Sequence, residues 1–152
     1  MKKERIMVVE DEIVTARSLQ MSLEKLDYVV TAIISSGEQA IQKLEDGDCP
    51  DLVLMDISLQ GKMDGIDTAR IINTRFDIPV IYLTSNVSKL VYDKAKTTNP
   101  YGYLTKPFKK DELHTVIELG LYRHKSDEDR RMLVTELKKE IVERNRIEKE
   151  LE

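Results

Sequence analysis

The most informative segment of the chain is Leu52-Val53-Leu54-Met55-Asp56, which directly follows Pro50-Asp51. Four consecutive apolar residues predict a short strand that is buried on both faces, as in a parallel sheet. Asp56 then stands at the carboxyl end of this strand, where open α/β sheets place their ligands. A carboxylate held there costs free energy unless a partner neutralises it. Asp56 is therefore the first candidate functional residue.

Four other segments have the same apolar character, and helical patterns separate them. The five strands are expected at residues 5–9, 29–34, 52–56, 78–83 and 102–105. Ser36 can cap the second helix, because Gln39 follows at the spacing of a capping box. The helix expected over residues 88–98 has no clean apolar stripe, whereas the helix that begins near residue 109 offers an apolar face made by Leu113, Val116, Ile117, Gly120 and Leu121. Short connections between alternating strands and helices demand right-handed crossovers, so the predicted fold class is α/β, a doubly wound parallel sheet.

Composition restricts the classes of protein that this chain can belong to. A length of 152 residues favours one domain with an appendage. The net charge is −4 and no basic stripe is present, which argues against direct binding of nucleic acid. No apolar run approaches the roughly 18 residues that a membrane span needs. Cys49 is the single cysteine, so no internal disulfide can form, and a cytoplasmic location is expected.

The last part of the chain has a different character. From Ser126 to Glu152 there is no Gly or Pro, and 16 of the 27 residues are charged. Apolar residues form only a broken heptad-like seam in which Leu137 and Ile141 are four apart. We expect a helix that continues from the last domain helix and is either solvated or paired in a coiled coil, the paired form being preferred. The expected division is a domain over residues 4–124 and a charged helical extension over residues 125–152.

Polar side chains follow four of the predicted strands. The carboxyl ends of parallel strands share one edge of the sheet, so these side chains should converge on one crevice. They are Glu10, Asp11, Asp56, Thr84 and Lys106. Three acids so close together would repel one another unless a cation lay among them, and carboxylate oxygens with room for water suit Mg²⁺. No thiolate or imidazole is expected nearby, which argues against zinc.

This set of residues predicts phosphoryl chemistry. Asp56 can act as a nucleophile, because carboxylates form aspartyl-phosphates. The charge that develops on the phosphoryl oxygens needs fixed positive partners, which the metal, Lys106 and the Thr84 hydroxyl can supply. The Lys106–Pro107 bond has access to the cis form, which would aim the amine into the crevice.

The motifs together resemble the receiver domain of two-component response regulators. They are Glu10-Asp11 after the first strand, Leu-Met-Asp56 after the third, Leu-Thr84-Ser85 after the fourth and Leu-Thr-Lys106-Pro107-Phe after the fifth. Each motif alone is weak, but the ordered set, each at a strand end, is highly specific. The resemblance covers about residues 4–124, does not reach the tail, and implies a flavodoxin-like (βα)5 sheet with strand order 2-1-3-4-5.

The resemblance also implies a role for each matching residue. Asp56 would accept a phosphoryl group from a phosphohistidine on a sensor histidine kinase or a histidine phosphotransfer protein. Asp11, Asp56 and the backbone carbonyl of Ser58 would hold Mg²⁺, and Glu10 would act through a metal-bound water. Lys106 would contact the phosphoryl group, Thr84 would swing toward it, and Tyr103 would turn inward as Thr84 moves. The positions that tune hydrolysis are Ser58 and Asn86, neither of which is a strong base.

The resemblance predicts a signalling module that catalyses only its own phosphorylation and dephosphorylation. Its output surface would be the fourth helix, fifth strand and fifth helix, and a homodimer could form through that surface or through the tail. Either the chain is a stand-alone receiver with a dimerising tail, or it ends within a linker helix that leads to an output domain, and the absence of a helix stop signal at Glu150-Leu151-Glu152 favours the second.

Other interpretations remain open at this point. Asp56 alone could be a capping or solvated acid, Thr84 alone a turn residue, and Lys106 alone a solvated lysine. A binding module that uses the fold without phosphorylation would normally lack an acid or the lysine. A Mg²⁺-dependent aspartyl phosphatase of the haloacid-dehalogenase type would need a second aspartate two residues after Asp56, where this chain has Ser58.

Overall fold

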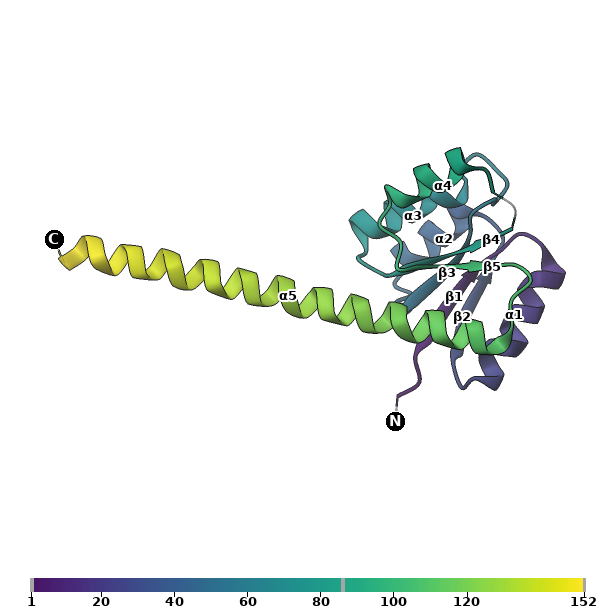
Figure 1. Ribbon diagram of the computed structural model, residues 1–152, viewed down its shortest axis with the longest axis horizontal. Coiled ribbons are helices and arrows are strands. Elements are labelled where there is room, and N and C mark those ends of the chain that lie inside the picture. Colours follow the sequence, from purple (N-terminus) through teal and green to yellow (C-terminus); the bar gives the residue numbers. More distant parts are fainter. Residues whose placement is uncertain (1, 86, 152) are drawn as a thin grey trace. The chain divides into compact units, whose positions relative to one another are not determined.

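A computed structural model describes residues 2–85 and 87–151 of the chain, so Asn86 lies outside the described residues. The strands are β1 (Arg5–Val9), β2 (Val29–Ile34), β3 (Leu52–Asp56), β4 (Val80–Thr84) and β5 (Gly102–Thr105). The helices are α1 (Ile13–Lys25), α2 (Gly37–Glu45), α3 (Gly65–Arg75), α4 (Lys89–Lys96) and α5 (Lys110–Leu151). All pairings are parallel and the strand order is β2-β1-β3-β4-β5, which confirms the predicted fold class (Figure 1).

Two apolar layers cover the sheet, one on each face. Alternate residues of the strands point to opposite faces, so neighbours such as Val8 and Val9 belong to different layers. One layer contains buried residues of α2 and α3 together with Ala95 of α4, and the other contains those of α1 and the first turns of α5. The central strand β3 is buried along its whole length, as the run from Leu52 to Asp56 predicts.

The fourth strand differs from its predicted bounds at both ends. It begins at Val80 rather than at Ile78, and it includes Thr84. Pro79 has no N–H to donate to a sheet ladder, and its carbonyl instead accepts a hydrogen bond from the N–H of Val53 at 2.9 Å. At the other end, Thr84 pairs with Thr105 in the β4–β5 register, which extends the ladder by one residue.

The helices follow their sequence signals with one correction, in α5. Ser36 caps α2 by accepting a hydrogen bond from the N–H of Gln39, as predicted. Ala95 is the one buried residue of α4, which explains why that segment has no apolar stripe. In α5 only Leu113, Ile117 and Gly120 are fully buried, whereas Val116 and Leu121 are partly buried at the margin of the layer.

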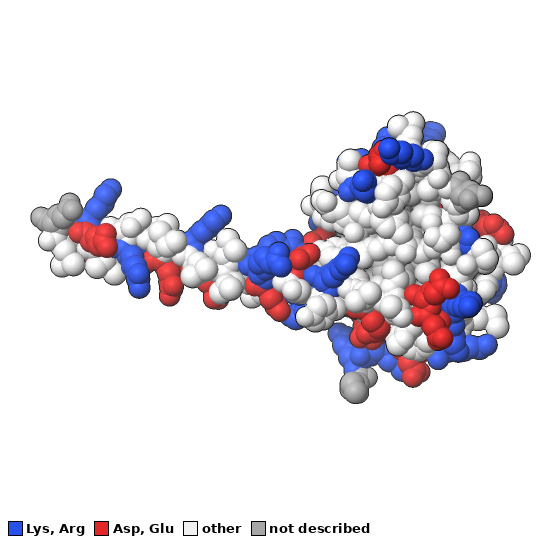
Figure 2. All heavy atoms as spheres, in the orientation of Figure 1, with Lys and Arg blue, Asp and Glu red and all other residues white. Residues whose placement is uncertain are grey.

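The chain divides into two compact units, Met1–Leu121 and Tyr122–Glu152. In the second unit α5 remains helical as far as Leu151, so the predicted helical extension is confirmed. Residues 129–151 are all exposed, and Figure 2 shows charges of both signs mixed along this helix. In the part of the chain that is described, no helix is both long and apolar enough to cross a membrane.

Candidate functional site

Two neighbouring strands bring three acids together at the carboxyl edge of the sheet. Val9 at the end of β1 pairs with Met55 of β3, so the residues that follow them lie side by side. The side chains of Glu10, Asp11 and Asp56 each offer an oxygen within 4.8 Å of the others. Glu10 and Asp56 are almost fully buried, with exposed fractions of 2% and 7%. The structure therefore brings these three predicted residues into one cluster.

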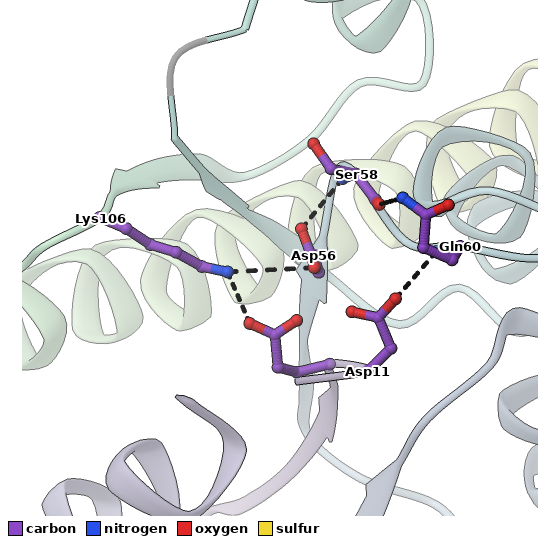
Figure 3. Close-up of polar contacts among 6 residues, drawn as sticks. Asp11, Asp56, Ser58, Gln60 and Lys106 are labelled. Carbon is purple, nitrogen blue, oxygen red and sulfur yellow. Dashed lines mark hydrogen bonds and ion pairs between the residues drawn. The ribbon is translucent and has the colours of Figure 1, made fainter. Parts of the chain in front are cut away.

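Lys106 reaches the same cluster from the end of β5. Its Nζ lies 2.5 Å from Glu10 Oε1 and 3.9 Å from Asp56 Oδ2. Figure 3 marks the contact between Lys106 and Asp56 with a dashed line. The N–H of Lys106 donates to the carbonyl of Thr84 at 2.6 Å, which links the ends of β4 and β5. The Lys106–Pro107 peptide bond is cis. The amine thus lies between two of the acids.

The environment of Glu10 makes its carboxyl a weaker acid than usual. The pKa of the Glu10 carboxyl is raised from 4.5 to about 7, because burial and the neighbouring Asp56 raise it by more than the Lys106 amine lowers it. Glu10 Oε2 is buried and has no hydrogen-bond partner within the described chain. A buried carboxylate oxygen without a partner is costly, so a proton or a cation is needed there.

The donor set fits Mg²⁺. Glu10, Asp11 and Asp56 supply carboxylate oxygens, one of which is the unpaired Glu10 Oε2, and the cluster includes neither His nor Cys. Hard oxygen donors of this kind suit Mg²⁺, which also keeps several water ligands. The N–H of Ser58 donates to Asp56 Oδ1 at 2.9 Å, so the residue whose carbonyl is the predicted fourth ligand is held against the cluster.

The two predicted switch residues come from adjacent strands. Thr84 ends β4 and is 7% exposed, and Tyr103 lies in β5. The centroid of the Tyr103 ring lies 5.9 Å from the ring centroid of Tyr82 and 5.1 Å from that of Tyr92 in α4. Its hydroxyl is buried with no hydrogen-bond partner among the residues described, and burial raises the pKa of that hydroxyl. Tyr103 thus lies among aromatic rings rather than in solvent.

Sequence reasoning did not identify three residues that the structure places around this site. Gln60 contacts both Asp11 and Ser58, and Glu38 of α2 contacts Met63 in the same loop. Tyr92 packs on Tyr103. The available signal was weak: Gln60 and Glu38 are polar residues in or near a loop, and Tyr92 is an aromatic residue in a helix without an apolar stripe.

An exposed apolar surface on α1 borders the acidic cluster. Ile13, Val14 and Met21 are 72%, 76% and 60% exposed. A hollow of about 480 Å³ runs along these residues. A second hollow of about 300 Å³ is lined by Ile13 together with Glu10 and Asp11. The apolar face of α1 is thus continuous with the edge of the sheet that carries the acids.

Comparison with known proteins identifies the family. The model of the response regulator receiver domain matches residues 6–118. The transcriptional regulatory protein PdtaR of Mycobacterium tuberculosis is 30% identical over 119 residues, which are 78% of this chain and 57% of that protein. This chain therefore belongs to the response regulator receiver domain family, and it spans little more than half the length of this curated relative.

Solved structures agree with this assignment. The receiver domain of a modulated diguanylate cyclase from Desulfovibrio desulfuricans is 35% identical, with a TM-score of 0.79, and the match covers 83% of this chain and 99% of that one. The receiver domain of the sensor histidine kinase PA1611 from Pseudomonas aeruginosa is 29% identical, with a TM-score of 0.71 and coverage of 79% and 98%. That second structure has a magnesium ion coordinated in its active-site cleft.

Proposed function

We propose that Asp56 accepts a phosphoryl group from the phosphohistidine of a sensor histidine kinase or histidine phosphotransfer protein, in a Mg²⁺-dependent reaction. The observation that carries this proposal is the meeting of Asp56 with Glu10, Asp11 and Lys106 at one edge of the sheet. An acid cluster of this kind with a single neighbouring amine suits the transfer of an anionic group to a carboxylate. In this proposal the chain catalyses only its own phosphorylation and dephosphorylation.

The chain's own residues contribute to this transfer in different ways. A carboxylate oxygen of Asp56 attacks phosphorus, the P–N bond breaks, and its electron pair returns to the imidazole nitrogen of the donor. The Lys106 amine, 3.9 Å from Asp56 Oδ2, is placed to neutralise charge on the phosphoryl oxygens. Asp11, Asp56 and the Ser58 carbonyl would hold Mg²⁺, and Glu10 would act through a water of the ion. When bound, Mg²⁺ supplies positive charge that offsets the acids and the phosphoryl oxygens.

Phosphorylation would bias a two-state equilibrium of the domain. Thr84 would move toward the phosphoryl group, and Tyr103 would adjust with it. Tyr103 packs on Tyr92 of α4, so a change at the phosphorylation site can reach the surface formed by α4, β5 and the first turns of α5. That surface is the proposed output of the domain, through a partner, an attached module or a second copy.

The donor protein would dock on α1. A phosphohistidine must reach Asp56, so the donor has to cover the edge of the sheet that carries the acids. The exposed apolar side chains of Ile13, Val14 and Met21 lie beside that edge. Contiguous exposed apolar surface rimmed by polar residues is typical of an interaction site. Arg17 and Lys25 line the same hollow and favour an acidic partner surface.

The tail helix and the composition of the chain bear on its oligomeric state, its location and its ligands. The exposed apolar residues of the tail helix support pairing with a second copy in a coiled coil. A cytoplasmic location and the absence of direct nucleic-acid binding are part of the proposal, and they are supported by the composition.

Incubation with Mg²⁺ and acetyl phosphate tests the proposal. The wild-type protein should gain one hydroxylamine-labile phosphate, measured as added mass, and EDTA should prevent it. Asp56→Asn should abolish this gain, whereas Asp51→Asn, an exposed aspartate at the opposite end of β3, should retain it. A wild-type protein that gains no phosphate, or an Asp56→Asn variant that gains as much, would contradict the proposal.

A further inference from the structure

The loop of residues 57–64 connects β3 to α3 and carries the predicted Ser58 ligand. Three of its backbone N–H groups donate to carboxylates that come from three different parts of the fold. They are Ser58 to Asp56 Oδ1 at 2.9 Å, Gln60 to Asp11 Oδ2 at 3.1 Å, and Met63 to Glu38 Oε1 at 3.1 Å. Side-chain carboxylates therefore hold the exposed middle of this loop.

Gln60 contacts two of the predicted metal ligands at once. Its backbone N–H donates to the Asp11 carboxylate, and its side-chain Nε2 donates to the Ser58 carbonyl at 3.3 Å (Figure 3). Asp11 follows β1 and Ser58 follows β3, so Gln60 connects ligands from two strands. The Gln60 side chain itself is exposed and packs into no apolar layer.

The two ends of the loop are fixed by other means. Ile57 and Leu59 are both 3% exposed and belong to the apolar layer of α2 and α3. Asp64 caps α3 by accepting from the N–H of Asp67 at 2.8 Å. At Gly65 an added Cβ would collide with the carbonyl oxygen of Asp56, so α3 begins in direct contact with the end of β3. Met63 also packs against this layer, so the exposed stretch from Gln60 to Lys62 depends most on the polar contacts.

We propose that Gln60 is a positioning residue of the Mg²⁺ site, which ties the Asp11 carboxylate and the Ser58 carbonyl together, and that Glu38 of α2 fixes the loop that carries it. The inference rests on the proposed function, because it assumes that these ligands hold Mg²⁺. Neither residue touches the reacting atoms. Each acts through ligands that it holds in place.

The hydrogen bonds of Gln60 leave the ligands able to bind a cation. The Ser58 carbonyl has two lone pairs, and Gln60 Nε2 uses one of them. The Asp11 carboxylate accepts the hydrogen bond from Gln60 through Oδ2, which leaves Oδ1 for the cation. Hydrogen bonds to groups that ligate a metal fix their orientation, and removing such a partner typically weakens metal binding about 10- to 100-fold.

The selectivity of the site should depend on the same contacts. Mg²⁺ demands near-ideal octahedral geometry at short distances, whereas Ca²⁺ accepts longer and more variable coordination. A loop that is tied to Asp11 through Gln60 restricts the positions of the Ser58 carbonyl. Loosening the loop should therefore weaken binding of Mg²⁺ more than binding of Ca²⁺.

Glu38 acts one step further from the metal ligands. It lies in the first turn of α2 and accepts from the N–H of Met63. Its Oε2 is also 4.0 Å from the position that a Cβ would take at Gly61, whose φ is +122°. Without the carboxylate, the N–H of Met63 loses its hydrogen bond to α2, although Met63 still packs beside Gly37 of α2. The segment from Gly61 to Met63 is then less well fixed, and the Gln60 contacts become less populated.

Calorimetric titration with Mg²⁺ and with Ca²⁺ tests Gln60. Gln60→Met keeps the length of the side chain and the backbone N–H that donates to Asp11, but removes the side-chain donor to the Ser58 carbonyl. Mg²⁺ should therefore bind about 3- to 10-fold more weakly, and the preference for Mg²⁺ over Ca²⁺ should fall. Gln42→Met is the matched control, because Gln42 is an exposed glutamine of α2 whose side chain donates a hydrogen bond to Asp46. The thermal unfolding midpoint in EDTA should be the same for both variants and the wild type.

Glu38 is tested by a pair of substitutions. Glu38→Ala should weaken Mg²⁺ binding about 2- to 5-fold and speed hydrogen exchange at the Met63 amide, since one hydrogen bond that orders the ligand loop is lost. Glu38→Gln retains an acceptor oxygen and should restore wild-type values. Glu45→Ala on the same helix serves as the control, because Glu45 pairs with Arg75 away from the loop.

The outcomes separate this inference from the proposed function. If the wild-type protein binds no Mg²⁺, the proposed function fails, and this inference fails with it. If the wild type binds Mg²⁺ but Gln60→Met matches Gln42→Met in affinity and in selectivity, the proposed function stands and the inference about Gln60 is overturned. A Glu38→Gln variant as weak as Glu38→Ala would overturn the role of Glu38.

Discussion

Lys106 and Glu10 form a largely buried ion pair in which Nζ lies 2.5 Å from Oε1, while the second oxygen of Glu10 has no hydrogen-bond partner in the described part of the protein. The same amine lies 3.9 Å from Asp56. One cation thus sits beside two buried acids and cannot neutralise both. Removing one member of a buried ion pair leaves an uncompensated charge in the interior. The cost of that charge exceeds the free energy that the intact pair contributes.

Lys106→Met should therefore separate metal binding from phosphorylation. The substitution removes the amine beside Asp56, so the rate of phosphorylation by acetyl phosphate should fall about 100-fold or more, as for loss of one donor to developing charge. Mg²⁺ should bind at least as tightly, because a competing positive charge has gone. Phosphorylation rates and calorimetric titration measure the two effects. Lys109→Met, at an exposed neighbouring position, is the control, and weaker Mg²⁺ binding by Lys106→Met would contradict the argument.

Stability without metal should depend on pH through Glu10. The pKa of Glu10 rises from 4.5 to about 7 on folding, so the folded state binds this proton more tightly than the unfolded state. The resulting stabilisation is complete below pH 4.5 and is lost as the pH rises through about 7. Glu10→Gln has no such proton. Between pH 5.5 and 7.5 in EDTA, the wild type should lose about 2 kcal/mol of unfolding free energy relative to Glu10→Gln.

Urea unfolding at several pH values measures this difference. Titrating groups that do not contact Glu10 change both proteins alike, so the quantity of interest is the difference between the two curves. Mg²⁺ should restore the stability of the wild type at the higher pH, because the ion binds only the folded arrangement of carboxylates. Parallel curves for the wild type and Glu10→Gln would show that Glu10 is ionised in the metal-free protein throughout this range.

The parts of the site that were predictable from sequence share one physical origin. Glu10, Asp56, Thr84 and Lys106 each stand where an apolar strand ends, and parallel strands bring such ends to one edge. Local pattern was therefore enough to predict that Glu10, Asp56 and Lys106 lie together. It did not predict that β4 begins at Val80. The start of that strand depends on hydrogen bonds to a distant segment, such as the one that the Pro79 carbonyl accepts from the N–H of Val53 in β3.

The residues that escaped prediction act through contacts that no local pattern encodes. Glu38 and Met63 are 25 positions apart, and their hydrogen bond exists only because α2 packs beside the loop. Gln60 bonds to Asp11 across 49 positions. Glu38 and Gln60 are both exposed polar residues, and exposed polar residues in or beside a loop are ordinary in any sequence.

The Tyr103 hydroxyl offers a test of packing at the proposed switch. It is buried without a hydrogen-bond partner in the described structure, and a buried polar group of this kind costs free energy. Tyr103→Phe keeps the ring against Tyr82 and Tyr92 and removes that cost. The unfolding free energy of the unphosphorylated protein should rise by up to about 1 kcal/mol in urea titration. A loss of more than about 1 kcal/mol would mean that the hydroxyl has a partner in solution.

Docking of the phosphodonor on α1 can be separated from chemistry at Asp56. Val14 is 76% exposed, so Val14→Asp should leave the unfolding free energy within about 0.5 kcal/mol of the wild-type value. Phosphorylation by acetyl phosphate should be unchanged, while transfer from a phosphorylated histidine kinase should slow about 10-fold, because a charge would be buried in an apolar interface. Glu24→Gln, at an exposed position near the other end of α1, is the control. If phosphorylation by acetyl phosphate and by the kinase slowed equally, the substitution would have disturbed the phosphorylation site and not docking.

Pairing of the tail helix should depend on its broken apolar seam. Leu137 and Ile141 are 48% and 57% exposed and lie four residues apart on one side of α5, so a second copy is the partner that would bury them. A double variant, Leu137→Glu with Ile141→Glu, keeps good helix formers and removes the seam. The wild type should sediment as a dimer, and the double variant as a monomer, with the same thermal midpoint for the receiver domain. Lys138→Gln, between these two positions in the sequence, should leave the dimer intact. Beryllofluoride mimics the phosphoryl group. If it changes the dimerisation constant of the wild type but not that of the double variant, the tail carries the signal. A wild type that is monomeric both with and without beryllofluoride would contradict this account.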